Sequence, residues 1–493
     1  MSIFNRVHEV IVHGAGHAGF AAVRELRAHG VDALLLDRGP ALLWETGWAF
    51  ADDVTDCAAP AWTAWCDRLT ARGACHAGRL DTGAVEAEAA ELLQTEAVPV
   101  LLYATPLAVE MTDDRLAAIT VATKGGLRRL AAKRWIDASD RGELATLCGA
   151  TEMPTPTRQR VHIVLRGQTW DRELPTSLAC SSLPMVNITV ETTRWTNERR
   201  LAIELPGDHA VDHGLWLPVL QAARTTWGNH LEHAIVTHGS VVPLPRWNAA
   251  ATPRGLPTNL VLATPATIGG GWKLGERFAL GLHAAAIVRD LPAATPALHG
   301  ELTQPRDVAP LTADIAVIGV GTGGAVAAIA AARTGRRTVA CDPMPFAGGI
   351  GSGGGIHNYY WGVRGGLQEE IDSRIQAVMP LFGALRQGSG FHPEAKKAVL
   401  AMMLREAGVD VRTGFQLATV TRNARRITSC LLAGPGTIHR VEALAWIDGT
   451  GDGDLCGLAG AQIQKGRCGD GLLHAYTQSC GRVQLDKDGH PCI

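Results

Sequence analysis

The sequence predicts an α/β fold in which one βαβ unit occurs twice along the 493-residue chain. The prediction depends on two stretches, 314–342 and 10–37, in which an apolar run leads into a glycine-rich turn and then a helix-like segment. Each stretch closes on a short second strand that ends in an acid, Asp342 or Asp37. The acid follows the first glycine of the turn at the same distance in both (342 − 319 = 23 and 37 − 14 = 23).

The turn of the second unit reads Gly319-Val320-Gly321-Thr322-Gly323-Gly324 and fits the G-x-G-x-x-G fingerprint of a dinucleotide-binding βαβ unit. Gly319 permits the tight turn, Gly321 lets the backbone approach a pyrophosphate, and Gly324 lets the helix pack on the strand. The helix N-terminus would offer unpaired N–H groups to phosphates. Asp342 would accept the ribose hydroxyls.

The turn of the first unit reads Gly14-Ala15-Gly16-His17-Ala18-Gly19, so Gly14, Gly16, Gly19 and Asp37 are the matching candidates. His17 lies inside the turn, where the backbone does the binding. We therefore interpret it as a position that tolerates variation.

A second pair of segments favours duplication over chance similarity. The stretch 135–144 lines up with 446–455, and 80–100 lines up with 391–411, at one offset (446 − 135 = 311 and 391 − 80 = 311). Shared order and shared offset indicate two Rossmann-like FAD- or NAD(P)-binding domains in tandem.

Length and composition agree with this class and exclude others. A chain of this length is expected to form two or more domains. A net charge of −2 without a long basic stripe argues against a nucleic-acid partner. No apolar run reaches membrane-spanning length and no signal-peptide pattern opens the chain, so a cytoplasmic protein without a membrane partner is expected. Eleven scattered cysteines without a C-x-x-C cluster predict reduced thiols and no metal site.

The domain organisation follows from changes in composition along the chain. Residues 1–150 with 246–290 are predicted as the first nucleotide-binding domain, and 291–310 as a proline-containing linker. Alternating apolar and polar runs within 151–245 predict an inserted β-rich cap or substrate domain. Residues 311–493 form the second nucleotide-binding domain. The elements expected within these domains are helices at 82–96, 215–233, 274–288 and 394–407, strands at 98–103, 259–265 and 409–412, and β-rich runs at 104–123 and 127–136.

The segment 343–357 after Asp342 is unusually rich in glycine, and we expect its backbone to run against an extended ligand rather than form a loose loop. Projected back by the offset, the end of the chain matches residue 182 (493 − 311 = 182). The second domain is therefore expected to be C-terminally incomplete. Either the sequence is a fragment of a longer protein, or another chain, such as a second copy in a homo-oligomer, completes the domain.

The fingerprint, its acid, the Gly348-Gly349 pair and the later run Ile447-Asp448-Gly449-Thr450-Gly451-Asp452-Gly453-Asp454-Leu455 resemble the FAD-dependent oxidoreductases. Within the glutathione-reductase-like flavoprotein superfamily, the resemblance is closest to relatives of the fumarate reductase flavoprotein. It covers nearly the whole chain twice, the second time in truncated form. The resemblance implies a Rossmann-like FAD domain with an inserted substrate domain.

The resemblance also implies the residues that hold FAD. The glycine-rich turn would hold the pyrophosphate, the Gly-Gly pair would run toward the flavin, and the later run would form a second turn near the nucleotide. The residues implied for the second copy are Gly319, Gly321, Thr322, Gly323, Gly324, Asp342, Gly348, Gly349, Thr450, Gly451 and Asp452, and those for the first copy are Gly14, Gly16, Gly19 and Asp37.

The first copy departs from the family pattern in two places. It lacks the Gly-Gly pair, and it has Asp140 where the second copy has Gly451. A carboxylate there would face the diphosphate. FAD binding by the first copy therefore stays open.

The expected chemistry is two-electron (hydride) transfer between FAD and a small organic substrate. No acid–base residue can be fixed from the sequence. His357 is the best single candidate, with Tyr359, Tyr360 and Arg364 nearby, although a histidine with a local hydrogen bond is the simpler interpretation. Two alternatives remain: an NAD(P)-dependent enzyme, and a non-catalytic subunit with a degenerate first site.

Overall fold

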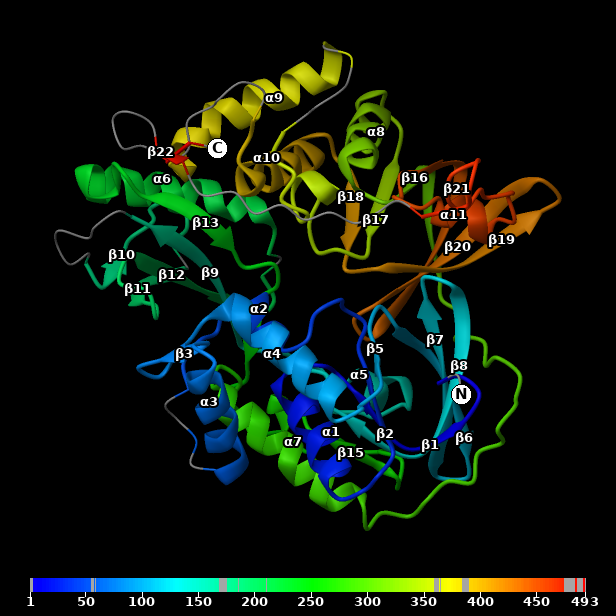
Figure 1. Ribbon diagram of the computed structural model, residues 1–493. Coiled ribbons are helices and arrows are strands. Elements are labelled where there is room, and N and C mark those ends of the chain that lie inside the picture. Colours follow the sequence, from blue (N-terminus) through cyan, green and yellow to red (C-terminus); the bar gives the residue numbers. More distant parts are fainter. Residues whose placement is uncertain are drawn as a thin grey trace.

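The computed structural model describes residues 3–54, 57, 59–167, 175–184, 186–209, 211–358, 363, 365–383 and 390–473, and the short strands β22 (Gln484–Leu485) and β23 (Pro491–Cys492). Three large sheets with helices against them make up this part of the chain (Figure 1). We name them the N-terminal, middle and C-terminal sheets. Tyr359, Tyr360 and Arg364 lie outside the described residues.

The N-terminal sheet has the order β5-β2-β1-β8-β7-β6. In addition, β15 pairs with the end of β8, beyond the part of β8 that pairs with β7. Its centre is parallel, because β1 pairs in parallel with both β2 and β8, whereas β6, β7 and β8 form an antiparallel meander. The strands are β1 (Val7–His13), β2 (Ala33–Leu36), β5 (Val100–Leu101), β6 (Thr105–Thr112), β7 (Arg115–Thr123), β8 (Gly126–Asp137) and β15 (Leu260–Leu262). The predicted strand 98–103 is thus shorter than expected, and 104–123 folds as a hairpin.

Helices cover the N-terminal sheet and bring distant segments together. They are α1 (His17–Ala28), α4 (Thr82–Thr95) and α7 (Leu274–Val288). Helix α7 packs so closely on α1 that a Cβ at Gly281 would lie 1.9 Å from the Ala18 carbonyl oxygen. Glycine is therefore required where the two backbones meet.

The C-terminal sheet has the order β18-β17-β16-β21-β20-β19, which is the order of the N-terminal sheet when strands are matched along the chain. The pairing agrees as well, since β16 lies in parallel between β17 and β21, and β19, β20 and β21 form a meander. The strands are β16 (Pro310–Ile318), β17 (Thr338–Asp342), β18 (Asp410–Thr413), β19 (Gln416–Asn423), β20 (Arg426–Gly434) and β21 (Thr437–Asp448); helices α8 (Thr322–Arg333) and α10 (Pro393–Glu406) pack beside them.

The middle sheet is antiparallel, with the order β10-β11-β12-β9-β13 and β14 beside β9. The strands are β9 (Arg158–Arg166), β10 (Ser177–Leu178), β11 (Asn187–Thr192), β12 (Glu198–Pro206), β13 (Ile235–Gly239) and β14 (Leu244–Arg246); helix α6 (Trp216–Trp227) covers one face. Its apolar core is continuous with that of α8 and α10. A segment that follows the N-terminal sheet in the chain thus packs on the C-terminal half.

The two outer sheets meet through their meanders, and corresponding residues face each other there. The Thr105 hydroxyl lies 3.4 Å from the side-chain amide of Gln416, its counterpart at the offset of 311. A small shared core joins two more corresponding pairs, Leu107 with Ala418 and Ala122 with Ala433. Contacts between corresponding residues are typical of an isologous interface, which a local twofold axis generates.

Among the described residues, no helix is both long and apolar enough to cross a bilayer.

The α1–α7 contact gives a test of the packing. Gly281→Ala is expected to lower the free energy of unfolding by about 2 kcal/mol, because the added methyl group overlaps the Ala18 backbone. A Gly-to-Ala change inside a helix ordinarily has the opposite sign, a gain of about 1 kcal/mol. Urea unfolding measures the difference, and an unchanged or higher stability would contradict the close approach.

Candidate functional site

The second fingerprint forms a closed turn between β16 and α8. Gly319 has a left-handed φ of +90°, and a Cβ there would lie 2.6 Å from Gly449 and Thr450 backbone atoms. A Cβ at Gly324 would lie 1.8 Å from the Gly319 carbonyl oxygen. Only glycine fits these two positions, and the result is a helix N-terminus that faces outward at the carboxyl end of β16.

Asp342 ties this turn to the end of β17. Its Oδ2 accepts a hydrogen bond from the Val320 amide (2.7 Å), and its Oδ1 accepts one from the Met344 amide (2.8 Å). Burial raises the pKa of the carboxyl group, and these two hydrogen bonds oppose the rise. Asp342 therefore sets the shape of the turn, and each of its oxygens retains a further lone pair for a ligand hydroxyl.

The second turn, at Thr450, is organised by another acid. Oδ1 of Asp448 accepts hydrogen bonds from the amide and the hydroxyl of Thr450 (3.0 and 2.6 Å), and Oδ2 accepts one from the Cys456 amide (2.9 Å). Gly451 has open space around it, because a Cβ there would meet no heavy atom within 4 Å. Asp452 lies at the exposed rim and pairs with Lys124.

The Gly-Gly pair packs on the fingerprint turn. The Gly348 amide donates to the Val320 carbonyl (2.8 Å), and the Thr322 hydroxyl donates to the Gly348 carbonyl (3.1 Å). A Cβ at Gly349 would lie 3.0 Å from the Gly321 Cα. The structure thus brings together the turn and the glycine-rich segment that the sequence predicted as one site.

A buried cation, Lys396 on α10, completes this group of residues. Its Nζ lies 3.4 Å from the Thr322 hydroxyl, and a Cβ at Gly351 would lie 2.4 Å from the same Nζ. Burial lowers the pKa of the ammonium group to about 8. The sequence analysis did not predict Lys396. Its counterpart in the first half is the apolar Val85 (396 − 85 = 311), and this change from an apolar to a charged residue is the signal that could have identified it.

A cavity of about 300 Å³ lies beside the turn, at the carboxyl ends of β16 and β17. This is the place at which open α/β sheets bind ligands. Both outer sheets contribute to its lining, which consists of Tyr103, Lys124, Ile318, Gly319, Cys341, Pro343, Met344, Phe415, Gln416, Leu417, Thr450, Asp454 and Leu458.

The first fingerprint repeats the scaffold in detail. Gly14 has a φ of +109°, and a Cβ at Gly19 would lie 1.7 Å from the Gly14 carbonyl oxygen. Asp37 accepts hydrogen bonds from the amides of Ala15 and Gly39, both at 2.6 Å. Asp137 binds the Ser139 amide and hydroxyl just as Asp448 binds those of Thr450.

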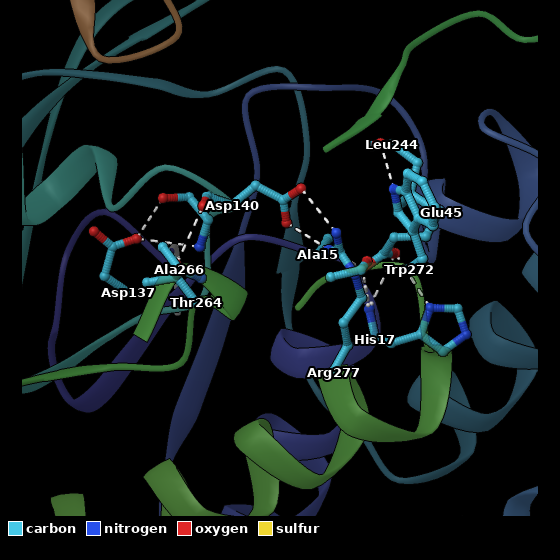
Figure 2. Close-up of polar contacts among 12 residues, drawn as sticks. Ala15, His17, Glu45, Asp137, Asp140, Leu244, Thr264, Ala266, Trp272 and Arg277 are labelled. Carbon is cyan, nitrogen blue, oxygen red and sulfur yellow. Dashed lines mark hydrogen bonds and ion pairs between the residues drawn. The ribbon is translucent and has the colours of Figure 1, made fainter. Parts of the chain in front are cut away.

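In the first fingerprint, however, a side chain of the protein lies at the helix N-terminus where the sequence predicted a pyrophosphate (Figure 2). The carboxylate of Glu45, on the short helix α2 (Trp44–Gly47), accepts hydrogen bonds from the amide (3.1 Å) and from Nδ1 (3.2 Å) of His17. A Cβ at Gly16 would lie 2.4 Å from Glu45 Oε1. Glu45 therefore occupies the N-terminus of α1, where a helix favours an anion.

Arg277 on α7 pairs with this carboxylate and with a second one. It donates to Glu45 (3.2 Å) and, through two nitrogens, to Asp140 (2.6 and 3.2 Å), and its side chain is buried (Figure 2). Burial alone would raise the pKa of Glu45, but His17 and Arg277 outweigh it and lower the pKa to about 2. Asp140, which stands where the second half has Gly451, belongs to this internal ion-pair group.

Our interpretation of His17 as a tolerant position was wrong. The imidazole is fully buried, bonds to Glu45 and lies within 3.4 Å of the Thr46 hydroxyl. It is part of the group that fills the turn.

A second group of charged side chains lies at the carboxyl ends of β1 and β2. Glu143 accepts from Nε2 of His13 and from Nε of Arg38, both at 3.2 Å. Burial opposes protonation of His13, but Glu143 outweighs it and raises the pKa of the imidazole. The counterparts in the second half are Ile318, Asp454 and Pro343 (318 − 13 = 305, 454 − 143 = 311, 343 − 38 = 305), of which only one carries a charge.

The backbone of residues 43–45 follows the path of the Gly-Gly segment in the second half. Leu43 has a left-handed φ of +48° and stands where Gly348 stands (348 − 43 = 305). Its amide donates to the Ala15 carbonyl at 2.8 Å, just as the Gly348 amide donates to Val320. The chain path is the same, but leucine, tryptophan and glutamate replace Gly-Gly-Ile along it.

A larger cavity, of about 540 Å³, lies between the glycine-rich segment, the middle sheet and the loops of the N-terminal half. Corresponding residues from the two halves line it, such as Gly83 and Glu394 (394 − 83 = 311). Oε1 of Glu394 accepts from Lys397 Nζ at 2.7 Å, whereas the buried Oε2 has no partner of hydrogen-bonding geometry among the described residues. Burial raises the pKa of this carboxyl group. The predicted candidate His357 is exposed, contacts the Gly355 carbonyl (3.4 Å) and is absent from the lining of this cavity.

Comparison with known proteins identifies the family. The profile of the family described as FAD dependent oxidoreductase matches residues 9–161 and 314–488, together more than half of the chain and including both fingerprints. The chain belongs to this family. The protein is accordingly an enzyme whose cofactor is FAD.

Solved structures show more distant similarity. The flavin-dependent brominase Bmp2 is 12% identical, with 58% of this chain and 81% of that chain covered and a TM-score of 0.41. The p-nitrophenol 4-monooxygenase PnpA from Pseudomonas putida is 15% identical (57% and 79% covered, TM-score 0.39). A geranylgeranyl bacteriochlorophyll reductase-like protein from Thermoplasma acidophilum is 12% identical (58% and 78% covered, TM-score 0.41). No curated protein matches the sequence.

The buried carboxylate at the first turn leads to a stability prediction. Glu45→Ala is expected to lower the free energy of unfolding by roughly 3–5 kcal/mol, because it leaves buried Arg277 and the His17 amide without their anion. Glu276→Ala, on the exposed side of α7, is the control and should change it by about 0.5 kcal/mol or less. An equally small effect of both substitutions would contradict the assignment.

The same carboxylate should also shape the pH dependence of stability. Its pKa is about 2 in the folded protein against an ordinary 4.5, so the unfolded chain takes up the proton first as pH falls. The stabilisation by Glu45 is present above about pH 5 and is lost toward pH 2. Urea unfolding at a series of pH values measures the free energy of unfolding. For Glu45→Gln, this free energy should lack the contribution that the wild-type protein loses as pH falls toward 2.

Proposed function

We propose that this FAD-dependent oxidoreductase carries out two-electron (hydride) transfer on a small organic substrate with one FAD per chain, held by the second fingerprint. The observation that carries the proposal is the contrast between the two turns. A Cβ at Gly321 would meet nothing closer than 3.8 Å, whereas one at Gly16 would meet the Glu45 carboxylate at 2.4 Å. Among the described residues, no carboxylate is hydrogen-bonded to the amides of residues 322–324.

The residues of the second turn fit the diphosphate of FAD. The N-terminal amides of α8 supply donors, Gly321 and Gly349 leave the backbone accessible, and Lys396 supplies a cation beside Thr322. The adenosine part would lie in the cavity of about 300 Å³ at the ends of β16 and β17. Thr450 of the second turn borders the same cavity.

The cavity of about 540 Å³ would receive the substrate, because Ser352, Gly353 and Gly355 of the glycine-rich segment line it. The bound FAD supplies two-electron transfer chemistry. The chain supplies Glu394, which has a raised pKa and can hold a proton at Oε2, and Lys397, which fixes its orientation. The middle sheet closes the cavity from the other side, where Arg200 pairs with Asp52 at 2.8 Å.

We also propose that the two halves arose by tandem duplication. The first domain would comprise 1–150 and 246–290, the cap 151–245, and the second domain 311–493. Equal strand order, a regular offset (305 around the fingerprints and 311 in the later segments) and equal hydrogen bonding around Asp137 and Asp448 support this history. In this view the first copy has become a structural domain whose nucleotide site is filled from within.

The decisive experiment is the absorption spectrum of the purified protein together with quantification of released FAD. One FAD per chain is expected. Gly321→Val should abolish FAD retention, since its side chain enters the space before α8, while Ala330→Val on the exposed side of the same helix should retain it. Two FAD per chain, or retention by Gly321→Val, would contradict the assignment.

Lys396 leads to a pH-dependent prediction. Because the pKa of its ammonium group is about 8, the charge is present below this pH and is lost above it. The affinity for FAD, measured by flavin fluorescence, should therefore fall as pH rises through about 8. Lys396→Met should bind FAD about tenfold more weakly at pH 7 with a flat profile, and Lys396→Arg should restore binding at high pH. A profile that is the same in all three proteins would rule out this role.

A further inference from the structure

The isologous contact between the outer sheets places residues of each half over the nucleotide site of the other. In the cavity of about 300 Å³ beside the second fingerprint, Tyr103 and Lys124 come from the N-terminal half. Tyr103 precedes β6, and Lys124 lies in the turn between β7 and β8. They are thus the part of the N-terminal half that reaches the cavity.

Gln416 of the C-terminal sheet fixes both residues. The side-chain amide is oriented so that both its nitrogen and its oxygen form hydrogen bonds. The nitrogen donates to the Tyr103 carbonyl (3.3 Å), and the oxygen accepts from the Lys124 amide (3.0 Å). The Tyr103 amide also donates to the Gly39 carbonyl at 3.1 Å. The Tyr103 backbone is therefore held from two sides, while the residue stays 41% exposed and lines the cavity.

The backbone conformation of Tyr103 is unfavourable for its side chain. Its φ is +53°, in the left-handed region that bulky residues rarely adopt. Its counterpart in the other half is Gly414, with a φ of +76° (414 − 103 = 311). The left-handed conformation is thus held by glycine on the side of the filled first turn and by tyrosine on the side of the open one. A strained tyrosine over the open site indicates a function for its ring.

Lys124 shows the same asymmetry. Its ammonium group pairs with Asp452 and lies 4.0 Å from Asp454, two carboxylates at the rim of the cavity. Its counterpart over the first site is the uncharged Pro435 (435 − 124 = 311). At these two positions, an aromatic ring and a cation therefore lie on the side of the open cavity, and glycine and proline lie on the other side.

We propose that Tyr103 and Lys124 are FAD-binding residues that the N-terminal half contributes to the site of the C-terminal half. The Tyr103 ring packs on the adenine, and Lys124 offsets the negative charge of Asp452 and Asp454 near the phosphates. The proposal rests on the proposed function of the second fingerprint. It assigns to the first half a direct part in holding the cofactor.

The test measures the dissociation constants of two ligands, FAD and ADP, for the apoprotein. ADP is the adenosine diphosphate part of FAD. Tyr103→Gly introduces the residue that the other half has at this position and relieves the left-handed strain, so the fold should be retained. FAD and ADP affinities should both fall about tenfold, as for loss of one base–aromatic stacking contact. Lys124→Met should weaken both ligands about threefold at low salt and less at high salt, because the pair is exposed.

Lys133→Met, an exposed lysine on β8 that pairs with Glu9, is the matched control and should leave both affinities unchanged. Wild-type FAD affinity in Tyr103→Gly overturns the proposal. A loss of FAD binding that is accompanied by a lower melting temperature of the apoprotein also overturns it, because the tyrosine would then act through the fold. Failure of the proposed function is distinguishable, since wild-type protein would then lack FAD or Gly321→Val would retain it.

Discussion

The structure depends on one constraint, which is that a helix beginning at a glycine-rich turn presents unpaired backbone amides that favour a negative charge. In the N-terminal half, Glu45 supplies the charge from within the chain. The other features of that half follow, because a buried carboxylate requires a cation, and Arg277 with its second partner Asp140 meets this need. Leu43 has a left-handed conformation, and the path of the chain after it places the Glu45 carboxylate at the turn.

The C-terminal half meets the same constraint differently. Glycines keep its turn accessible, and the nearby charge is positive, from Lys396, which is the arrangement on which the proposed binding of the FAD diphosphate rests. The two halves thus share one backbone design, and they differ in whether a carboxylate of the chain occupies the turn. The difference resides in side chains at a few corresponding positions rather than in strand order or connectivity.

Much of this architecture could be predicted from the sequence because it is encoded locally. The glycine spacing, the acids Asp37 and Asp342 and the common offset predicted two βαβ units, and the departure at Asp140 pointed to an altered first site. The Glu45–Arg277 pair could not be predicted, since 232 positions separate its members and no periodicity relates them. The packing of the middle sheet on α8 and α10 is equally non-local. Lys396 was hidden for another reason, because a lysine in a helix is usually an exposed residue.

The isologous contact between the two meanders has a consequence for evolution and for assembly. Two subunits that meet through such a surface normally associate according to their concentration, and a change in one appears in both. When both surfaces belong to one polypeptide, the local concentration of the partner is fixed by the linker and does not fall on dilution. Each surface can also change independently of the other. A single chain can therefore keep the geometry of a dimer while its two glycine-rich turns differ in what lies at them.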